Sequence, residues 1–366
     1  MKNFVLALVA FGMMAGCGKE MDQQWSQLGV DLQNSGYTTN TFNVNAPTQK
    51  WVFKAENRVD SSPAIENGVV YFGCNDSYLY AVDLESGQQL WRFRATRSIN
   101  SSPTISDGIV YFGDRSGYFY ALFADSGQLF WRYIGAGAVS SSPKVTHGLV
   151  LFGSYNNNFY ALDSHNGEIV WSFETGSPVQ STPAVDGDMV FFGSWDHHMY
   201  ALDVRTGDEI WKFETDNLLA GDPAIANGQI FFGSWDHHMY ALDTSTGDEI
   251  WKFKADSLIA SSPAIANDLV VFGGYDMHLY ALNISDGQQQ WKIPVEGPIL
   301  ARPVISGQTV YIPSFRGQLY AIDLQTGEQK WTFSTSRHTG QIVSSPAIVN
   351  GILLFGSRDN HLYALE

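Results

Sequence analysis

From residue 48 to the C-terminus, short apolar runs alternate with turn-forming residues, and the whole pattern recurs every 40 residues. Most units contain a Trp-x-Phe pair, a Ser-Ser-Pro type segment, an apolar run ending in Phe-Gly, and a Tyr-Ala-Leu triplet. Self-similarity at this period predicts an array of repeated supersecondary units. The tryptophans that mark the units are Trp51, Trp91, Trp131, Trp171, Trp211, Trp251, Trp291 and Trp331.

Each unit is predicted to form four short β-strands. Asn-Gly or Asp-Gly pairs such as Asn67-Gly68 separate the second strand from the third, which is a strong signal for a two-residue hairpin. An Asp-x-x-Thr/Ser-Gly sequence such as Asp203 to Gly207 closes the fourth strand, where Asp caps the turn and Gly supplies a positive φ. Four strands of about 5–6 residues with short turns account for about 40 residues. The predicted fold is therefore all-β, an eight-bladed β-propeller with four-stranded antiparallel blades.

The two ends of the array predict how the ring closes. Trp51 to Phe53 form a Trp strand with no Tyr-Ala-Leu strand before it, whereas the last unit stops at Glu366, directly after its Tyr-Ala-Leu triplet. We expect the N-terminal Trp strand to complete the C-terminal blade. This pairing would leave no open sheet edge in the ring.

The N-terminus has the layout of a bacterial lipoprotein signal. An apolar run from Phe4 to Met14 follows Lys2 and is too short to span a bilayer. The small residues that follow it precede Cys17, in a pattern that resembles the lipobox, where the thiol is acylated with fatty acids such as palmitate. Gly18, in place of Asp, suggests sorting to the outer membrane in lipoproteins of this kind. An ordinary cleaved signal peptide is the alternative.

These features predict three segments. Residues 1–16 are expected to be the lipoprotein signal peptide, residues 17–47 the lipidated cysteine followed by a polar tether, and residues 48–366 the propeller. The second segment is rich in Gln, Asn, Thr and Ser without periodicity, which is typical of a tether. The patches around Trp25 and Asn34 offer a second interpretation, in which they pack on the body of the fold.

Composition excludes several classes of function. The chain has 37 acidic and 21 basic residues and a net charge of −16, so it lacks the basic face that a nucleic-acid binder needs. Two cysteines cannot make a disulfide scaffold. Acylation of Cys17 would leave Cys74 unpaired, as a small residue at a strand end.

The His197-His198 and His237-His238 pairs are the strongest metal candidates, because neutral imidazoles suit Zn²⁺ or Cu²⁺. The two pairs lie in segments 191–216 and 231–256, which differ at only four of 26 positions. Such near-identity indicates a recent duplication, which copies His without selecting it. Adjacent strand residues also point to opposite faces. We therefore expect neither a metal site nor a catalytic site.

A candidate site for partner proteins lies in the loops between the third and fourth predicted strands. Two residues beyond Phe-Gly, five consecutive units carry an aromatic side chain, and we call this set the aromatic arc: Tyr155, Trp195, Trp235, Tyr275 and Phe315. Inter-blade loops carrying Leu218 and Leu258 are expected on the same face. One interpretation is that the aromatics fill the wedge between blades; the other is that they anchor a partner protein.

The Ser-Ser-Pro strands are expected to line the central channel. Asp222 and Arg302 replace serine in two of them. These charges are either solvated independently or paired across part of the channel.

The Ala-Leu-Asp-x-x-Thr-Gly-x-x-x-Trp pattern over residues 51–366 resembles the tryptophan-docking repeat of pyrroloquinoline-quinone-type propellers. Phe123, Asn283 and Pro313 depart from it. A lipobox followed by eight such blades resembles the BamB family of outer-membrane assembly factors, although those blades are less uniform than the present ones. The resemblance implies a non-catalytic scaffold that is lipid-anchored in the outer membrane, faces the periplasm and binds proteins of the β-barrel assembly machinery.

Two alternatives remain open. Quinone dehydrogenases share the fold, and that resemblance implies a quinone stacked between a Trp and a disulfide of adjacent cysteines, with Ca²⁺ held by oxygen ligands. Cys17 and Cys74 are not adjacent, so we expect no cofactor, but a quinone- or metal-dependent oxidoreductase is one alternative. The other is a surface lipoprotein that binds a glycan or another protein.

Overall fold

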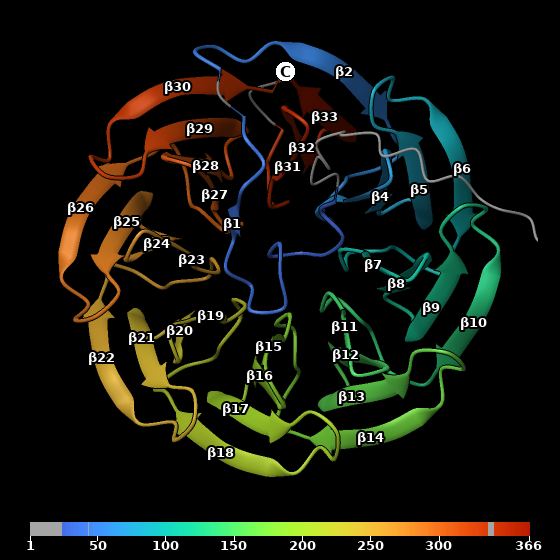
Figure 1. Ribbon diagram of the computed structural model, residues 1–366, viewed down its shortest axis with the longest axis horizontal. Coiled ribbons are helices and arrows are strands. Elements are labelled where there is room, and N and C mark those ends of the chain that lie inside the picture. Colours follow the sequence, from blue (N-terminus) through green and yellow to red (C-terminus); the bar gives the residue numbers. More distant parts are fainter. Residues whose placement is uncertain (1–23, 43, 336–339) are drawn as a thin grey trace, which may run out of the picture.

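The computed structural model describes residues 24–366 apart from 43 and 336–339, and it consists of strands and turns arranged as a closed ring of eight blades. Figure 1 views the ring along its axis, with the blades following one another around a central channel. In the described part of the chain, no helix is long and apolar enough to cross a membrane. The predicted fold is confirmed.

The strands fall into four concentric sets, and each blade takes one strand from each set in antiparallel order. The innermost strands are β3 (Ala64–Glu66), β7 (Thr104–Ser106), β11 (Lys144–Thr146), β15 (Ala184–Asp186), β19 (Ala224–Ala226), β23 (Ala264–Ala266), β27 (Val304–Ser306) and β31 (Ala347–Val349). The second strands are β4 (Val69–Gly73), β8 (Ile109–Gly113), β12 (Leu149–Gly153), β16 (Met189–Gly193), β20 (Gln229–Gly233), β24 (Leu269–Gly273), β28 (Thr309–Pro313) and β32 (Ile352–Ser357).

The third and fourth sets form the outer part of the ring. The third strands are β5 (Tyr78–Asp83), β9 (Tyr118–Phe123), β13 (Asn158–Asp163), β17 (His198–Asp203), β21 (His238–Asp243), β25 (His278–Asn283), β29 (Gln318–Asp323) and β33 (His361–Leu365). The outer strands are β6 (Gln89–Arg94), β10 (Leu129–Ile134), β14 (Ile169–Glu174), β18 (Glu209–Glu214), β22 (Glu249–Lys254), β26 (Gln289–Pro294), β30 (Gln329–Ser334) and β2 (Gln49–Lys54).

The turns adopt the conformations that their residues favour. Asn67 and Gly68 both have positive φ, 52° and 77°, as a two-residue hairpin between β3 and β4 requires. In the turn after β17, the Asp203 carboxylate accepts the N–H groups of Arg205 and Thr206, both at 2.9 Å. These turns set the approach of one blade to the next.

The same turns dock the blades on each other through tryptophan. The Trp171 indole Nε1 donates to the Val204 carbonyl at 3.1 Å, and Gly207 packs so closely on the Trp171 ring that a Cβ would lie 2.7 Å from it. Six other tryptophans of the repeat donate in the same way to a carbonyl of the neighbouring blade at 2.9–3.0 Å, and Trp331 donates to the N-terminal segment. Recurring Gly and Trp therefore form one inter-blade contact.

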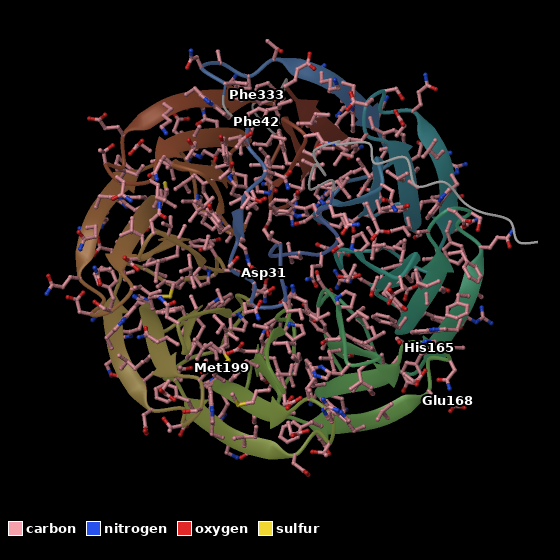
Figure 2. All side chains as sticks on the ribbon, in the orientation of Figure 1. Asp31, Phe42, His165, Glu168, Met199 and Phe333 are labelled. Carbon is pink, nitrogen blue, oxygen red and sulfur yellow. The ribbon has the colours of Figure 1, made fainter. Side chains whose placement is uncertain are left out.

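The ring closes as predicted, and the N-terminal segment adds a second contact. Strand β2 pairs antiparallel with β33, with Trp51 opposite Ala364. The last blade lacks its own turn, and the Val44 carbonyl takes that turn's place as acceptor for the Trp331 indole at 3.0 Å. Figure 2 shows Phe42 close to Phe333 in this region, and Phe42 belongs to the core that Phe333 packs against.

Residues 25–38, which we call the plug, cross the channel instead of forming a free tether. Figure 1 shows this segment passing through the middle of the ring before it runs outward to β2, and Asp31 is labelled near the centre in Figure 2. Its final part, β1 (Tyr37–Thr38), pairs parallel with β27. The described part of residues 17–47 thus follows the second interpretation, in which the Trp25 and Asn34 patches pack on the fold.

Backbone hydrogen bonds hold the plug to the innermost strands in chain order. In six blades, one inner-strand N–H donates to a plug carbonyl at 2.7–2.9 Å. The donors are Ile65, Ile105, Val185, Ile225, Ile265 and Ile305. In the third blade, the Lys144 ammonium takes this role and donates to the carbonyls of Leu28 and Asp31, both at 2.6 Å. The plug is thus part of the folded ring.

Candidate functional site

The channel holds a cavity of about 400 Å³ above the plug, which we call the bowl. Leu28 of the plug is among its lining residues, and its wall is built from the residues that precede the innermost strands. Counted outward from the channel, the loops between the second and third strands of each blade form its rim. These are the loops of the aromatic arc, and their residues in the rim are Arg115, Tyr155, Trp195, Trp235 and Arg358. Its volume falls in the range of small-molecule sites, roughly 300–1,000 Å³.

A ring of hydrogen bonds ties the wall of the bowl together. At one equivalent position per blade, the backbone N–H donates to the side-chain oxygen of the next blade, at distances from 2.7 to 3.4 Å. The eight positions are Ser62, Ser102, Ser142, Thr182, Asp222, Ser262, Arg302 and Ser345. The ring is interrupted only between Ser262 and Arg302, because a guanidinium group offers no acceptor.

Asp222 and Arg302 form an ion pair across part of the channel. The Arg302 Nη2 lies 3.1 Å from the Asp222 Oδ2, and Nη1 donates to the Asn34 carbonyl of the plug at 2.6 Å. The Arg302 side chain is only 1% exposed, and this burial lowers its pKa while Asp222 opposes the shift. Of the two interpretations that the sequence left open, the paired one is correct.

Lys144 is a second buried cation below the bowl, and it is not among the candidate residues predicted from the sequence. It is fully buried, and burial lowers the pKa of its ammonium to about 7, with Asp31 and Asp222 raising it and Arg302 lowering it further. The equivalent residue is Ala, Thr or Val in the other seven units. That departure from small side chains was the available signal.

The aromatic arc is graded in exposure rather than uniform. Trp235 and Tyr275 are 37% and 47% exposed, whereas the other three members are partly buried. The Tyr155 and Trp195 rings meet edge to face at 5.4 Å, and the Arg358 guanidinium lies 5.5 Å from the Phe315 ring. Wedge filling therefore describes part of the arc and does not describe Trp235 or Tyr275.

The predicted neighbours of the exposed aromatics are in place. Leu218 and Leu258 are partly buried, and their carbonyls accept the backbone N–H groups of Trp235 and Tyr275 at 3.1 and 3.0 Å. The inter-blade loops and the arc thus share one face of the ring. Sequence periodicity alone predicted this arrangement.

The opposite side of the rim is charged. Arg358 pairs with Asp60 at 2.9 Å, and the Asn75 amide donates to the same carboxylate at 3.0 Å. Arg115 is exposed beside Tyr155 and has no ion-pair partner within 4 Å among the described residues. An aromatic side and an arginine side therefore face each other across one mouth.

The histidine pairs do not converge. His197 precedes β17 with a φ of 74° and is exposed, whereas the ring of His198 lies 3.4 Å from the Asp196 carboxylate. His238 has the same relation to Asp236 at 3.2 Å. Within residues 24–366, apart from the few not described, no group of three or more His, Cys, Asp or Glu is arranged to hold a metal ion.

Of the two cysteines, the structure describes only Cys74. Cys74 is buried at the end of β4, where its Sγ lies 3.3 Å from the carbonyls of Asn57 and Arg58, and burial raises the pKa of its thiol. This agrees with the predicted small residue at a strand end. Cys17, the predicted lipidation site, lies outside the described residues.

Known proteins include relatives of this chain. A family model described as outer membrane protein assembly factor BamB matches residues 42–213 and 196–366. BamB from Moraxella catarrhalis superimposes with a TM-score of 0.75 at 19% identity, over 87% of this chain and 99% of that chain. No curated protein matches.

Two enzymes have the same fold. Quinohemoprotein alcohol dehydrogenase from Comamonas testosteroni gives a TM-score of 0.81 at 16% identity, over 94% of this chain and 80% of that one. A europium-containing methanol dehydrogenase gives 0.77 at 13% identity, over 94% of this chain and 98% of that one. At these identities the likeness concerns the fold alone.

The residues of the bowl do not fit a quinone held beside a metal ion. Its two carboxylates, Asp60 and Asp222, are each engaged by an arginine rather than left as oxygen ligands for a hard cation. Cys17 and Cys74 are far apart in the chain, so the disulfide of adjacent cysteines that the resemblance implied cannot form. No catalytic step through such a group follows from this site.

Proposed function

The chain belongs to the family of the outer membrane protein assembly factor BamB, and from this premise we propose that it is a non-catalytic scaffold that binds other proteins during assembly of β-barrel outer membrane proteins. The observation that carries the proposal is the exposed part of the aromatic arc. Trp235 and Tyr275 stand on adjacent blades, backed by the loops of Leu218 and Leu258. Large aromatic side chains are enriched among the residues that dominate protein interfaces.

We propose that the partner contacts the whole arc, with Tyr155, Trp195 and Phe315 supporting the two exposed members. Buried neighbours hold an anchor in one orientation, which lowers the entropy lost on binding. Rigid strands on both sides of each loop serve the same purpose. A prepared surface of this kind suits a scaffold.

The lipid anchor is the second part of the proposal. The Met14 to Cys17 sequence supports acylation of Cys17 after removal of residues 1–16, with attachment to the outer membrane and a periplasm-facing propeller. Cys17→Ser should move the protein from the membrane fraction to the soluble fraction. Retention in the membrane fraction would contradict this part of the proposal.

Photo-crosslinking in intact cells tests the binding face. A photoreactive residue at Tyr275 or Trp235 should capture a protein of the outer membrane assembly machinery. The same residue at Ser245, an exposed turn position at the other end of Trp235's blade, is the matched control and should capture little. Equal capture at the two ends, or none at the arc, would overturn the proposal.

The oxidoreductase alternative has weaker support. It rests on the fold shared with the two dehydrogenases, whereas the paired carboxylates of the bowl favour a site without a metal ion. A titration with the quinone separates the two, because stoichiometric binding with a spectral shift is expected only of the enzyme.

A further inference from the structure

The residues that line the bowl include buried polar atoms that the protein itself does not satisfy. In the described residues, five buried side-chain nitrogen or oxygen atoms have no hydrogen-bond partner, and three of them belong to residues that line the bowl. These are Asn100 Oδ1, Trp195 Nε1 and Arg302 Nε. Buried polar groups are almost always paired, so their concentration around one cavity needs an explanation.

Most backbone N–H groups of the channel wall are already used. At the level of the plug, inner-strand N–H groups bind plug carbonyls, and one step nearer the mouth they bind the side-chain oxygens of the next blade. An added peptide strand would need these same N–H groups. The ligand of the bowl must therefore be recognised mainly by side chains.

The side chains that remain are mostly hydroxyls and amides. Ser62, Ser102 and Ser142 each accept one backbone N–H, which leaves each hydroxyl hydrogen available to donate. Higher in the wall, Asn100 and Gln180 add two amide groups. Together they can exchange many hydrogen bonds with a ligand rich in oxygen.

The bowl also has an apolar side. In the layer that holds Asn100 and Gln180, the opposite blades carry Ala220, Ala260 and Leu300. The indole of Trp235 stands above them at the rim. A ligand that matches both sides must have one polar edge and one apolar face.

We propose that the bowl binds a mono- or disaccharide unit, free or at the end of a glycan. A sugar ring presents C–H groups that pack on an indole and hydroxyl groups that pair with amides and hydroxyls. The cavity of about 400 Å³ is of small-molecule size. Arg115, which has no ion-pair partner among the described residues, suits an acidic sugar in particular.

This site borders the proposed protein-binding face and shares Tyr155, Trp195 and Trp235 with it. Tyr275, Phe315, Leu218 and Leu258 belong to the proposed protein-binding face and do not line the bowl. Variants of these four residues and of Asn100, which belongs to the bowl alone, therefore separate loss of partner binding from loss of sugar binding.

Saturation-transfer NMR on the full chain tests the proposal, with glucose, N-acetylglucosamine, maltose, chitobiose and glucuronic acid as probes, followed by titration and a glycan array. At least one sugar should bind with a Kd of about 1 mM or lower. Asn100→Ala and Trp195→Phe should each weaken that sugar about tenfold, because each removes one unpaired polar group. Tyr275→Leu, at the same loop position as Trp195 but outside the bowl, should leave the affinity unchanged.

Melting temperatures of the three variants should match the parent, which separates loss of binding from loss of fold. Arg115→Ala replaces Trp195→Phe if the latter fails to fold, and it should weaken glucuronic acid selectively. The proposal is overturned if no sugar binds, or if sugar binding persists unchanged in both Asn100→Ala and Trp195→Phe. Binding of an acidic peptide without any sugar would also overturn it.

Discussion

The outer wall of the ring keeps the 40-residue repeat, whereas the channel departs from it. All eight tryptophans of the repeat donate their indole N–H to a carbonyl of the neighbouring blade or of the N-terminal segment. Trp195, at the rim of the bowl, has an indole N–H without a partner in the described residues. The same residue type thus docks the blades at one radius and lines the bowl, with its indole N–H unpaired, at another.

The difference separates residues that every blade needs for folding from residues that occur in one blade only. A residue that every unit shares satisfies a contact that every blade needs. Asp222, Arg302 and Lys144 occur once each, and all three contact either the plug or each other. Departures from the repeat therefore identify the parts of the channel that are particular to this chain.

Removal of the closing strand should have the largest effect. Deletion of residues 51–55 removes most of β2, leaves the edge of β33 unpaired and abolishes the Trp51 docking contact. We expect a loss greater than the about 3–5 kcal/mol of one buried Trp→Ala change, with aggregation. Lys50→Ala is the control on the same strand, since its exposed ion pairs are worth at most about 1 kcal/mol. The check is the unfolding free energy from chemical denaturation. Equal values for the deletion variant and the parent would mean that the two ends of the ring do not meet.

Loss of one partner of the buried ion pair should come next. Arg302→Ser leaves Asp222 without its counter-charge and should cost about 3 kcal/mol of unfolding free energy. Adding Asp222→Ser to the same chain gives all eight blades a hydroxyl at this position, so the ring of hydrogen bonds can close. The double variant should recover most of the lost unfolding free energy. A double variant as unstable as Arg302→Ser alone would show that the pair is not what stabilises this part of the channel.

A smaller effect should appear in the pH dependence of stability. Burial lowers the pKa of Lys144 to about 7 from its ordinary value of 10.5, so folding releases a proton between these values. Stability should therefore rise with pH, by about 1–2 kcal/mol from pH 7 to 8.5. Lys144→Met should lose this slope.

The measurement should stay below pH 9. The raised pKa of Cys74 acts in the opposite direction, but only above the thiol's ordinary value of 9.0. Parallel slopes for the parent and Lys144→Met in urea titrations would contradict the assignment.

The ring itself could be predicted from the sequence because every strand and turn is specified locally. Asn-Gly pairs, the Asp and Gly of the long turns, and the docking tryptophans recur in register, so one unit explains all eight. The closure followed from what the first and last units lack. Such local signals can be recognised in the sequence without knowing which distant residues are in contact.

The plug could not be predicted because its partners are distant and mostly backbone groups. Leu28 meets Lys144 across 116 positions, and Asn34 meets Arg302 across 268. The exposure of each member of the aromatic arc could not be predicted from the sequence either. Tyr155 is partly covered by Trp195, whereas Tyr275 at the same loop position is exposed. Neighbouring side chains decide these outcomes, and the repeat pattern does not report them.

Paired substitution of two tryptophans in one blade tests the central claim most directly. Trp251, a docking residue, is 7% exposed and belongs to the same sheet as Trp235, which is 37% exposed on the rim. Trp251→Ala should cost about 3–5 kcal/mol of unfolding free energy. Trp235→Ala should cost less than about 1 kcal/mol, yet weaken partner capture by about 2 kcal/mol or more. Equal losses of stability at the two positions would contradict the division between a repeat that holds the ring and a mouth that binds.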